Sequence, residues 1–291
     1  MDIRVIDDTS YESAKILWSI CFPEDQGPFL DYYFSRRTSP KMVAAAFEKE
    51  KMIAGMHIIP QRIKIGGAEK PVAFVAGVAT LPEFRNHGVI TRVFEWAFGY
   101  MAKQGFQATV LQPFDPKFYA KFGYMPFAER LECIFEPAGL SMEEACAPAS
   151  LNASDMLYIY NDFMSRYDGY TVRNPHDSEL LLEEFSMPGA SSVRIGDAYA
   201  LYYSDAKTAF VSEIAGGDIM PMIRHLCSGF QSVNAPLPIG HPLSKYGCSK
   251  RAVFNVIKPL DEAELMKGTG YATLLSMLER NREHFYSFDR Y

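Results

Sequence analysis

The spacing of apolar residues in the first sixty positions changes from that of a strand to that of a helix and back. Residues 2–6 alternate as in a strand, whereas the apolar positions from Ala14 to Ile20 recur at helical spacing until Pro23. Two later apolar runs flank the polar turn at 48–51, as in a hairpin. The predicted elements are a strand at 2–6, helices at 10–22 and 29–34, and strands at 43–47 and 52–59.

A short, strongly apolar strand is predicted next, followed by a long amphipathic helix. Residues 74–80 are apolar on both faces, as in a central strand, and Gly77 within them indicates a bulge or a close backbone approach. A stripe of apolar residues from Gly88 to Met101 predicts the helix. A strand at 107–111 and a short helix at 115–122 follow.

The second half repeats this order of elements faintly. The stretch at 145–153 has the small and polar composition of a linker. After it we predict helices at 180–185 and 219–226 and strands at 199–203, 209–214 and 232–236. Because 291 residues exceed the usual size of one domain, we expect an α+β fold in two domains, at 1–138 and 139–291.

Composition and charge exclude several classes of protein. Hydrophobic residues make up 48% of the chain, enough for a sizeable core, and the net charge of −6 gives no general attraction to nucleic acid or anionic lipid. The five cysteines include no CxxC pair, so neither a zinc site nor a disulfide framework is indicated. The amino terminus is too polar for a signal peptide, and the run at 71–82 is too short to span a bilayer. We expect a soluble, cytosolic protein with no metal.

The segment after the apolar strand has the features of an anion-binding site. It consists of Val78-Ala79-Thr80, four further residues, and Arg85-Asn86-His87-Gly88-Val89-Ile90-Thr91. The first N–H groups of a helix lack partners within it and lie at the positive end of its dipole, so a pyrophosphate fits there. Gly88 leaves the backbone accessible, and Arg85 and His87 can add charge or hydrogen bonds. A glycine before a helix is more often only a turn, but the strand and long helix around this one favour a phosphate site.

The second candidate element is Phe118-Tyr119-Ala120-Lys121-Phe122-Gly123-Tyr124. Phe118 and Phe122 share one helical face, which we assign to the core. Tyr119 lies off that face, where its hydroxyl can reach a cleft. Taken alone, such a residue is more often a half-buried amphipathic tyrosine. Its place one helix and one strand after the phosphate loop favours a functional role.

Together these elements resemble the GNAT superfamily of acyl-CoA N-acyltransferases, and its Eis-like branch in particular. The resemblance rests on an early Cys-Phe-Pro, then Gly-Val-Ala-Thr-x-Pro-Glu-x-Arg, Gly-Val, and Phe-Tyr-x-Lys-Phe-Gly-Tyr, in order over residues 1–138. It implies a GNAT-type mixed twisted sheet flanked by helices, with a second, degenerate GNAT-like domain. Members of the branch usually finish with a sterol-carrier-like domain, and this sequence shows no counterpart of it after the strand-like run at 252–257.

The resemblance implies acetyl-CoA as acyl donor and a role for each matching position. Backbone groups of Val78, Ala79 and Thr80 would hold the pantetheine arm and the thioester carbonyl, with the Ala79 N–H as a candidate oxyanion donor. Tyr119 would be the general acid, because a tyrosine (pKa ~10) can protonate an alkyl thiolate (~8.5) as it departs. The residues expected along the rest of the cofactor are Arg85, Asn86, His87, Gly88, Val89, Ile90 and Thr91, with Phe114 and Asp115 flanking it.

The general base is less clearly marked. In the Eis-like branch the terminal carboxylate of the chain is the base, which implies Tyr291 here, at the end of an aromatic tail. A frayed terminus explains that tail equally well. The other candidate bases are Glu24, Asp25, His57 and Glu83, all more typical of a surface or a hairpin.

We therefore expect an N-acetyltransferase that moves the acetyl group of acetyl-CoA to a primary amine of a small molecule or peptide. The alternative is a non-catalytic acyl-CoA-binding or regulatory module on the same fold. A third, weaker interpretation is an interaction protein whose second half provides a partner surface. Tyr119 favours the enzyme, and no sequence feature identifies the acceptor or the oligomeric state.

Overall fold

The computed structural model describes residues 1–141 and 147–288, and the chain divides into two units. The described residues of the first unit are 1–126 and 255–277, and those of the second are 127–141, 147–254 and 278–288. This division differs from the predicted single cut after residue 138, because the chain enters the second unit earlier and later returns to the first. Within the described part of the chain, no helix combines the length and hydropathy needed to cross a membrane.

A mixed sheet forms the centre of the first unit. Its strand order is β1-β2-β3-β4-β5, followed by the last residues of β12. Neighbouring strands are antiparallel except β4 and β5, which run parallel. The strands are β1 (Asp2–Val5), β2 (Val43–Glu48), β3 (Lys51–Ile65), β4 (Ala68–Thr80), β5 (Ala108–Leu111) and β12 (Cys248–Pro259).

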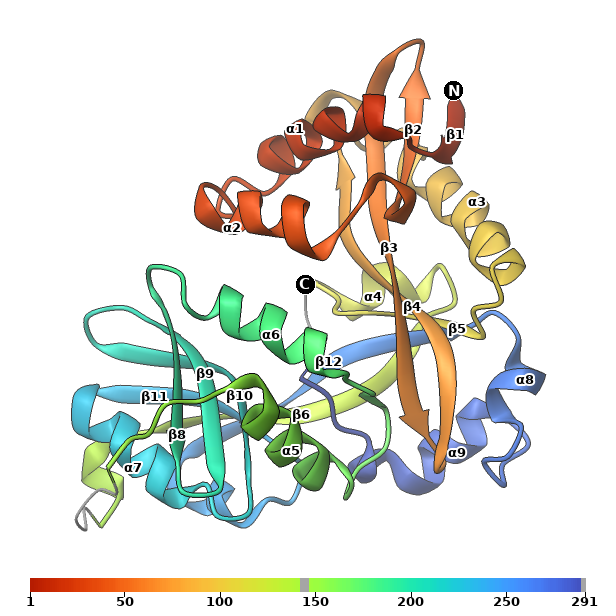
Figure 1. The fold of residues 1–291 in the computed structure, drawn as a ribbon. Helices are drawn as coiled ribbons and strands as arrows, with labels where there is room; N and C mark the ends of the chain where they lie inside the picture. Colours follow the sequence, from red (N-terminus) through yellow and green to blue (C-terminus); the bar gives the residue numbers. More distant parts are fainter. Residues whose placement is uncertain (142–146, 289–291) are drawn as a thin grey trace. The chain divides into compact units, whose positions relative to one another are not determined.

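Helices cover both faces of this sheet, because its central strands are apolar on both sides. The first five residues of β2 are all buried, and alternate ones, beginning with Val43, pack against α1. Helices α1 and α2 lie on one side of the strands and α3 on the other (Figure 1). The helices of this unit are α1 (Tyr11–Cys21), α2 (Pro28–Tyr32) with a π-helical turn after it (Tyr33–Arg37), α3 (Val89–Lys103), α4 (Pro116–Ala120) and α8 (Glu262–Met266), and α9 (Leu274–Asn281) begins here.

The segment that returns to the first unit is fastened to β4 and β5. Lys70, buried in β4, donates to the carbonyl oxygens of Glu264 and Lys267 at 2.7 and 2.6 Å. The last residues of β12 pair with β5, with Val256 opposite Leu111. The side-chain hydrogen bonds of Lys70 and the pairing of β12 with β5 therefore join segments far apart in the sequence into one unit.

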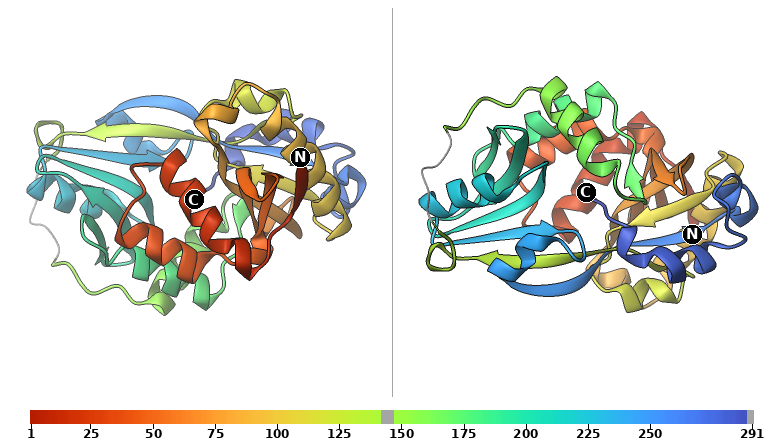
Figure 2. Two further views of the ribbon diagram at one scale, coloured as in Figure 1. Left: turned by 90° about the horizontal axis from the view of Figure 1, so that it is seen from above. Right: turned by 90° about the horizontal axis from the view of Figure 1, so that it is seen from below.

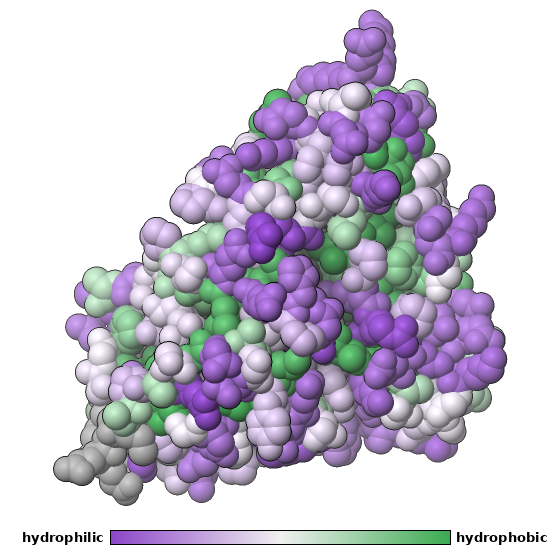
Figure 3. All heavy atoms as spheres, in the orientation of Figure 1, coloured by the Kyte–Doolittle hydropathy of each residue, from purple (hydrophilic) through white to green (hydrophobic). Residues whose placement is uncertain are grey.

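The predicted turn at 48–51 is confirmed as the connection between β2 and β3. All four of its residues are exposed, and Lys49 adopts a positive φ of 56°. In the space-filling view the tip at the top of the first unit, where Figure 1 shows this hairpin, is hydrophilic (Figure 3). This turn therefore consists of charged, solvent-exposed residues only.

The second unit repeats the topology of the first. Its strand order is β6-β11-β10-β9-β8, and the parallel pair β10 and β11 is joined by α7 as β4 and β5 are joined by α3. Helix α7 packs on Ala209 and Val211, whereas α5 packs on Tyr199 and Leu201 (Figures 1 and 2). The elements are β6 (Met125–Phe135), α5 (Ala153–Met164), β7 (Tyr170–Thr171), α6 (Pro175–Glu184), β8 (Ala190–Ile195), β9 (Ala198–Ser204), β10 (Thr208–Gly216), α7 (Met220–Gly229) and β11 (Ser232–Leu237).

Candidate active site

The two motifs singled out in the sequence follow the carboxyl ends of the two parallel strands of the first unit. The loop before α3 follows β4, and α4, which carries Tyr119, follows β5. Neighbouring parallel strands end at the same edge of a sheet, and in open α/β sheets ligands bind outside that edge. The fold therefore brings the predicted phosphate loop and the predicted acid to one end of the sheet.

Strand β4 has an open edge at this end. Its pairing with β5 runs from Val72 opposite Ala108 to Phe74 opposite Val110, although β4 continues to Thr80. The five steps from Val75 to Thr80 cover ~17 Å at ~3.3 Å per residue. An extended ligand with amide groups can hydrogen-bond along such an edge as an added strand would.

A β-bulge interrupts β4 where Gly77 was predicted to mark one. Gly55 lies opposite Ala79, and His57 lies opposite Ala76, so that two residues of β4, Gly77 and Val78, oppose a single residue of β3. Gly77 has a φ of +55°, a conformation that favours glycine. Bulges re-aim the backbone that follows them, and here that backbone is the open end of β4.

The pairing with β3 decides which N–H groups face the open edge. Leu81 donates its N–H to the carbonyl of Ile53 in β3 at 2.9 Å. Because the direction alternates along a strand, the N–H of Ala79 also points toward β3, whereas that of Thr80 points toward the open edge. This alternation favours the N–H of Thr80 over that of Ala79 as the candidate oxyanion donor.

Arg85 fastens the end of β4. Its Nε donates to the carbonyl oxygen of Thr80 at 3.0 Å, and its Nη2 lies 4.0 Å from Cys21 Sγ. Cys21, in the sequence motif Cys-Phe-Pro, also donates to the Thr80 carbonyl at 3.4 Å. Arg85 was expected beside the phosphates, and the structure shows its guanidinium engaged with Thr80. Sequence reasoning assigned no role to Cys21.

The loop before α3 presents backbone N–H groups to solvent. Arg85 donates its N–H to the Pro82 carbonyl, and Arg92 donates its N–H to the Gly88 carbonyl at 3.3 Å. Gly88 occupies the N-cap position with φ +71°, and nothing lies within 4 Å of where its Cβ would be. Asn86 also has a positive φ, 64°. The space around Gly88 is therefore open at the start of α3, as an anion site at a helix N-terminus requires.

Tyr119 is more deeply buried than the sequence predicted. It is 4% exposed, and its ring lies 5.6 Å from that of Phe114 and 6.2 Å from that of Phe94 in α3. Burial raises the pKa of Tyr119 to about 12. The expected core face holds Phe122, whereas Phe118 is only half-buried, because α4 turns Tyr119 toward α3. A tyrosine in this state keeps its proton at neutral pH, as a general acid must.

Phe114 and Asp115 differ in whether their side chains are free to contact a ligand. Phe114 is 77% exposed although it lies beside Tyr119. An exposed aromatic ring of this size is suited to covering a ligand. The carboxylate of Asp115 caps α4 by accepting from the N–H of Lys117 at 2.9 Å. Asp115 is therefore committed to the helix, and only Phe114 presents its side chain freely.

The candidate bases lie in different environments. His57, expected at the surface, is buried at 3% exposure, and desolvation lowers its pKa to about 3. Glu83 is exposed and pairs with Lys51 at 2.7 Å. Asp25 is half-buried, accepts from Trp18 Nε1 at 3.2 Å, and has a pKa raised by desolvation. Tyr291 lies outside the described residues.

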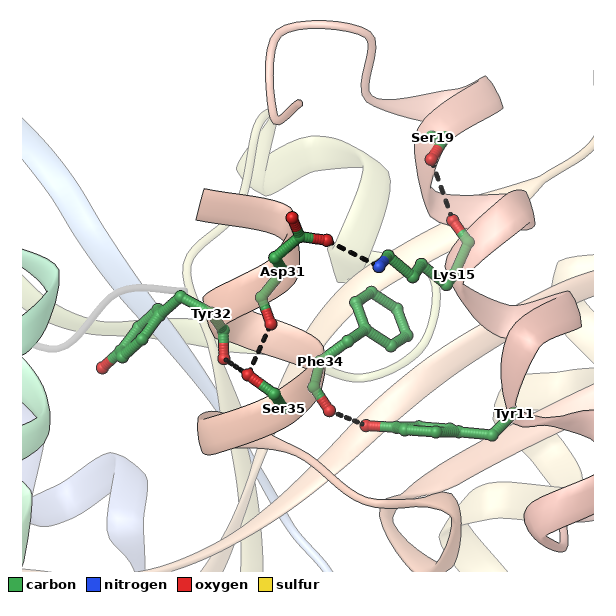
Figure 4. Close-up of polar contacts among 7 residues, drawn as sticks. All are labelled: Tyr11, Lys15, Ser19, Asp31, Tyr32, Phe34 and Ser35. Carbon is green, nitrogen blue, oxygen red and sulfur yellow. Dashed lines mark hydrogen bonds and ion pairs between the residues drawn. The ribbon is translucent and has the colours of Figure 1, made fainter. Parts of the chain in front are cut away.

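Helices α1 and α2 form a fixed wall next to these residues. Lys15 pairs with Asp31 at 2.7 Å, and the hydroxyl of Tyr11 donates to the Phe34 carbonyl at 2.7 Å (Figure 4). Between the two helices, the buried indole of Trp18 packs against the rings of Phe22 (5.0 Å) and Tyr33 (4.6 Å). The sequence analysis did not identify Trp18, although it is one of only two tryptophans in the chain.

A comparison with known families finds one match, which lies in the first unit. Residues 2–127 match the family model of the acetyltransferase (GNAT) domain. The matched region contains the bulged strand, the open loop and Tyr119. Its end at residue 127 coincides with the boundary between the units. No curated protein matches the sequence.

Solved structures share the fold of both units. A probable N-acyltransferase of unknown function from Enterococcus faecalis V583 aligns with a TM-score of 0.74 at 15% identity, over 89% of this chain and 72% of that one. A GCN5-related N-acetyltransferase from Kribbella flavida aligns with 0.69 at 17% identity, over 89% and 71%. Eis1 from Mycobacterium abscessus aligns with 0.69 at 18% identity, over 91% and 75%. These likenesses confirm the predicted α+β fold with its mixed twisted sheet.

Proposed function

We propose that the protein is an N-acetyltransferase that takes the acetyl group of acetyl-CoA and transfers it to a primary amine of a small molecule or peptide. The observation that carries this proposal is the uncovered N-terminus of α3 directly after the open edge of β4. The pyrophosphate would bind the N–H groups of residues 86–91, and the pantetheine arm would lie along Val78–Thr80. The GNAT family match over 2–127 supports the same donor.

The residues at this end of the sheet supply the chemistry of acetyl transfer. Attack of a neutral amine on the thioester carbonyl creates an oxyanion, which the N–H of Thr80 on the open edge would stabilise, an interaction of ~3–4 kcal/mol where such donors have been removed. Tyr119, protonated and buried beside Phe114, would give its proton to the departing thiolate. Arg85 would hold the Thr80 peptide in place, and Phe114 would cover the bound arm.

The finer assignment to the Eis-like branch is part of the proposal. It is supported by the sequence motifs and by the structural likeness to Eis1. It implies that the carboxylate of Tyr291 accepts the proton of the attacking amine. The alternative base is Asp25, which accepts a hydrogen bond from Trp18 and whose pKa is raised by desolvation.

An assay of thiol release from acetyl-CoA with a panel of amines tests the proposal. The panel contains polyamines, aminoglycosides, arylalkylamines and peptides with a free amino terminus, each measured with and without the protein. Release that depends on one amine class, with the acetylated amine found by mass spectrometry, supports the enzyme. Saturable binding of acetyl-CoA without acetylation of any amine would favour the non-catalytic module instead. Absence of both would reject the site.

A further inference from the structure

His57 lies in the core of the first unit directly next to the bulge of β4. Its ring is 3% exposed, and it lies opposite Ala76, the last residue of β4 before the bulge. Buried histidines need hydrogen-bond partners, because an unsatisfied polar group in a core costs ~1–3 kcal/mol. An apolar residue could fill the same space without the cost of burying a polar group, so the hydrogen-bond partners of this ring are informative.

Two hydroxyl groups hold one nitrogen of the imidazole. Tyr33 Oη lies 3.2 Å and Thr38 Oγ1 lies 3.3 Å from His57 Nδ1. Because burial lowers the pKa of His57 to about 3, the ring is neutral at physiological pH. Nδ1 can accept from one of these hydroxyls or, in the other tautomer, donate to it. The ring is therefore fixed in rotation as well as in position.

The fixed ring supports Trp18, and Trp18 supports the bulge. The two rings meet edge to face, with 5.1 Å between centroids and 70° between planes. The indole also lies against Gly77, where a Cβ would come within 2.2 Å of Trp18 Cζ3. His57, Trp18 and Gly77 line one small cavity together with Ala79.

We infer that His57 is a positioning residue: held by Tyr33 and Thr38, it presses Trp18 against the bulge of β4 and so sets the direction of the Val78–Thr80 peptides toward the thioester. The inference rests on the acetyltransferase function proposed above. In this inference the buried cluster of His57, Tyr33 and Thr38 orients the oxyanion donor. His57 touches neither donor nor acceptor.

The carbonyl stretch of bound acetyl-CoA, labelled with ¹³C at the acetyl carbonyl, reports this aim directly by difference infrared spectroscopy. A hydrogen bond to the thioester oxygen shifts the band to lower frequency. In the double variant Tyr33→Phe/Thr38→Val, Nδ1 loses both partners, and most of that shift should be lost. The dissociation constant of acetyl-CoA should stay within about threefold, because the phosphate loop supplies most of the affinity and is untouched.

A triple variant and a control separate positioning from mere stability. Adding His57→Phe to the double variant removes the unsatisfied nitrogen and keeps a ring against Trp18, so the band shift should return. Ser35→Ala removes a hydroxyl that donates to the Asp31 carbonyl on the same π-helical turn (Figure 4), and it should leave the shift unchanged. If the double variant does not fold, Thr38→Val alone should lose part of the shift.

Three results with the variants would overturn the inference. The double variant could keep the full band shift, it could lose affinity in parallel with the shift, or the triple variant could fail to regain it. A wild-type protein that binds acetyl-CoA without any shift would overturn it as well, while leaving the cofactor site standing. A wild-type protein that does not bind acetyl-CoA would reject the proposed function and this inference together.

Discussion

The carboxylate of Asp218 accepts a hydrogen bond from the N–H of Met220, with 3.0 Å between Oδ1 and N. Met220 begins α7, the helix that joins the parallel strands of the second unit, and Pro221 follows it without an N–H to offer. The equivalent helix of the first unit has Gly88 as its N-cap, with open space where a Cβ would lie. The same topology thus ends in a covered helix N-terminus in one unit and an open one in the other.

We expect one acetyl-CoA per chain. A carboxylate at the N-terminus of α7 repels a pyrophosphate and occupies the N–H group that would bind it. Isothermal titration calorimetry should therefore give a stoichiometry of one. A value of two would show that the second unit also binds the cofactor.

Gly88→Glu should abolish the stabilisation of the protein by acetyl-CoA. In the wild type, ligand at ~100 times its Kd adds ~2.7 kcal/mol to the free energy of unfolding, visible as a rise in melting temperature. The variant places a negative charge on the phosphate path. Gly99→Glu is the matched control, because Gly99 lies in the same helix with open space beside it and no positive φ. Gly88→Asn, which tolerates the left-handed conformation, controls for backbone strain. A rise that persists in Gly88→Glu would rule out this loop.

Tyr119→Phe should lower kcat by ~10²–10⁴ while acetyl-CoA binding survives, because only the hydroxyl is lost. The acid works in its protonated form, and its pKa is raised to about 12. The wild-type kcat should therefore not decline between pH 8 and 10, where a tyrosine with an ordinary pKa would begin to ionise. Pre-steady-state measurement of thiol release across this range checks both points. Full kcat in the variant would mean that the acid is elsewhere.

The free energy of unfolding should fall as the pH is lowered from 6.5 toward 5. The folded-state pKa of His57 is about 3, below the value of 6.5 for an exposed histidine, so the unfolded chain binds more protons in this window and acid favours unfolding. The half-buried His241, whose pKa burial also lowers, acts in the same direction. Urea titrations of the wild type and of the triple variant Tyr33→Phe/Thr38→Val/His57→Phe should show a shallower pH dependence in the variant. Identical slopes would show that His57 is not desolvated as described.

A tag appended after Tyr291 should reduce turnover strongly and leave acetyl-CoA affinity intact. Such a tag moves the terminal carboxylate, whose reference pKa of ~3.5 keeps it ionised and able to accept a proton. A protein tagged at the amino terminus is the control. Equal rates for the two would eliminate the terminal carboxylate and direct attention to Asp25.

The sequence predicted those parts of the site that depend on local signals. The bulge at Gly77 and the loop-to-helix junction at Gly88 follow from the glycines themselves and from the pattern around them. The direction of the Ala79 N–H could not be predicted, because it depends on the register with β3 across the bulge. The burial of Tyr119 was missed because it depends on Phe94, which α3 brings over α4.

Elements that depend on distant partners were also missed. Strand β6 has no clear alternation in the sequence, and its place is set by pairing with β11 about a hundred residues later. Helix α5 is different, because Met156, Ile159 and Phe163 recur at helical spacing. That helical signal was present in the sequence. The preceding stretch at 145–153, of which 145 and 146 lie outside the described residues, had been assigned to a linker.

The pairing of Leu111 with Val256 has a consequence for how the chain is made. Synthesis at ~5–20 residues per second leaves β5 without this neighbour for roughly 7–30 s after it has left the ribosome. During that time the first unit carries an unpaired strand edge, which favours aggregation. Ribosome-bound chains arrested before residue 248 should therefore recruit general chaperones. The chaperones should dissociate once β12 has left the ribosome and can pair with β5.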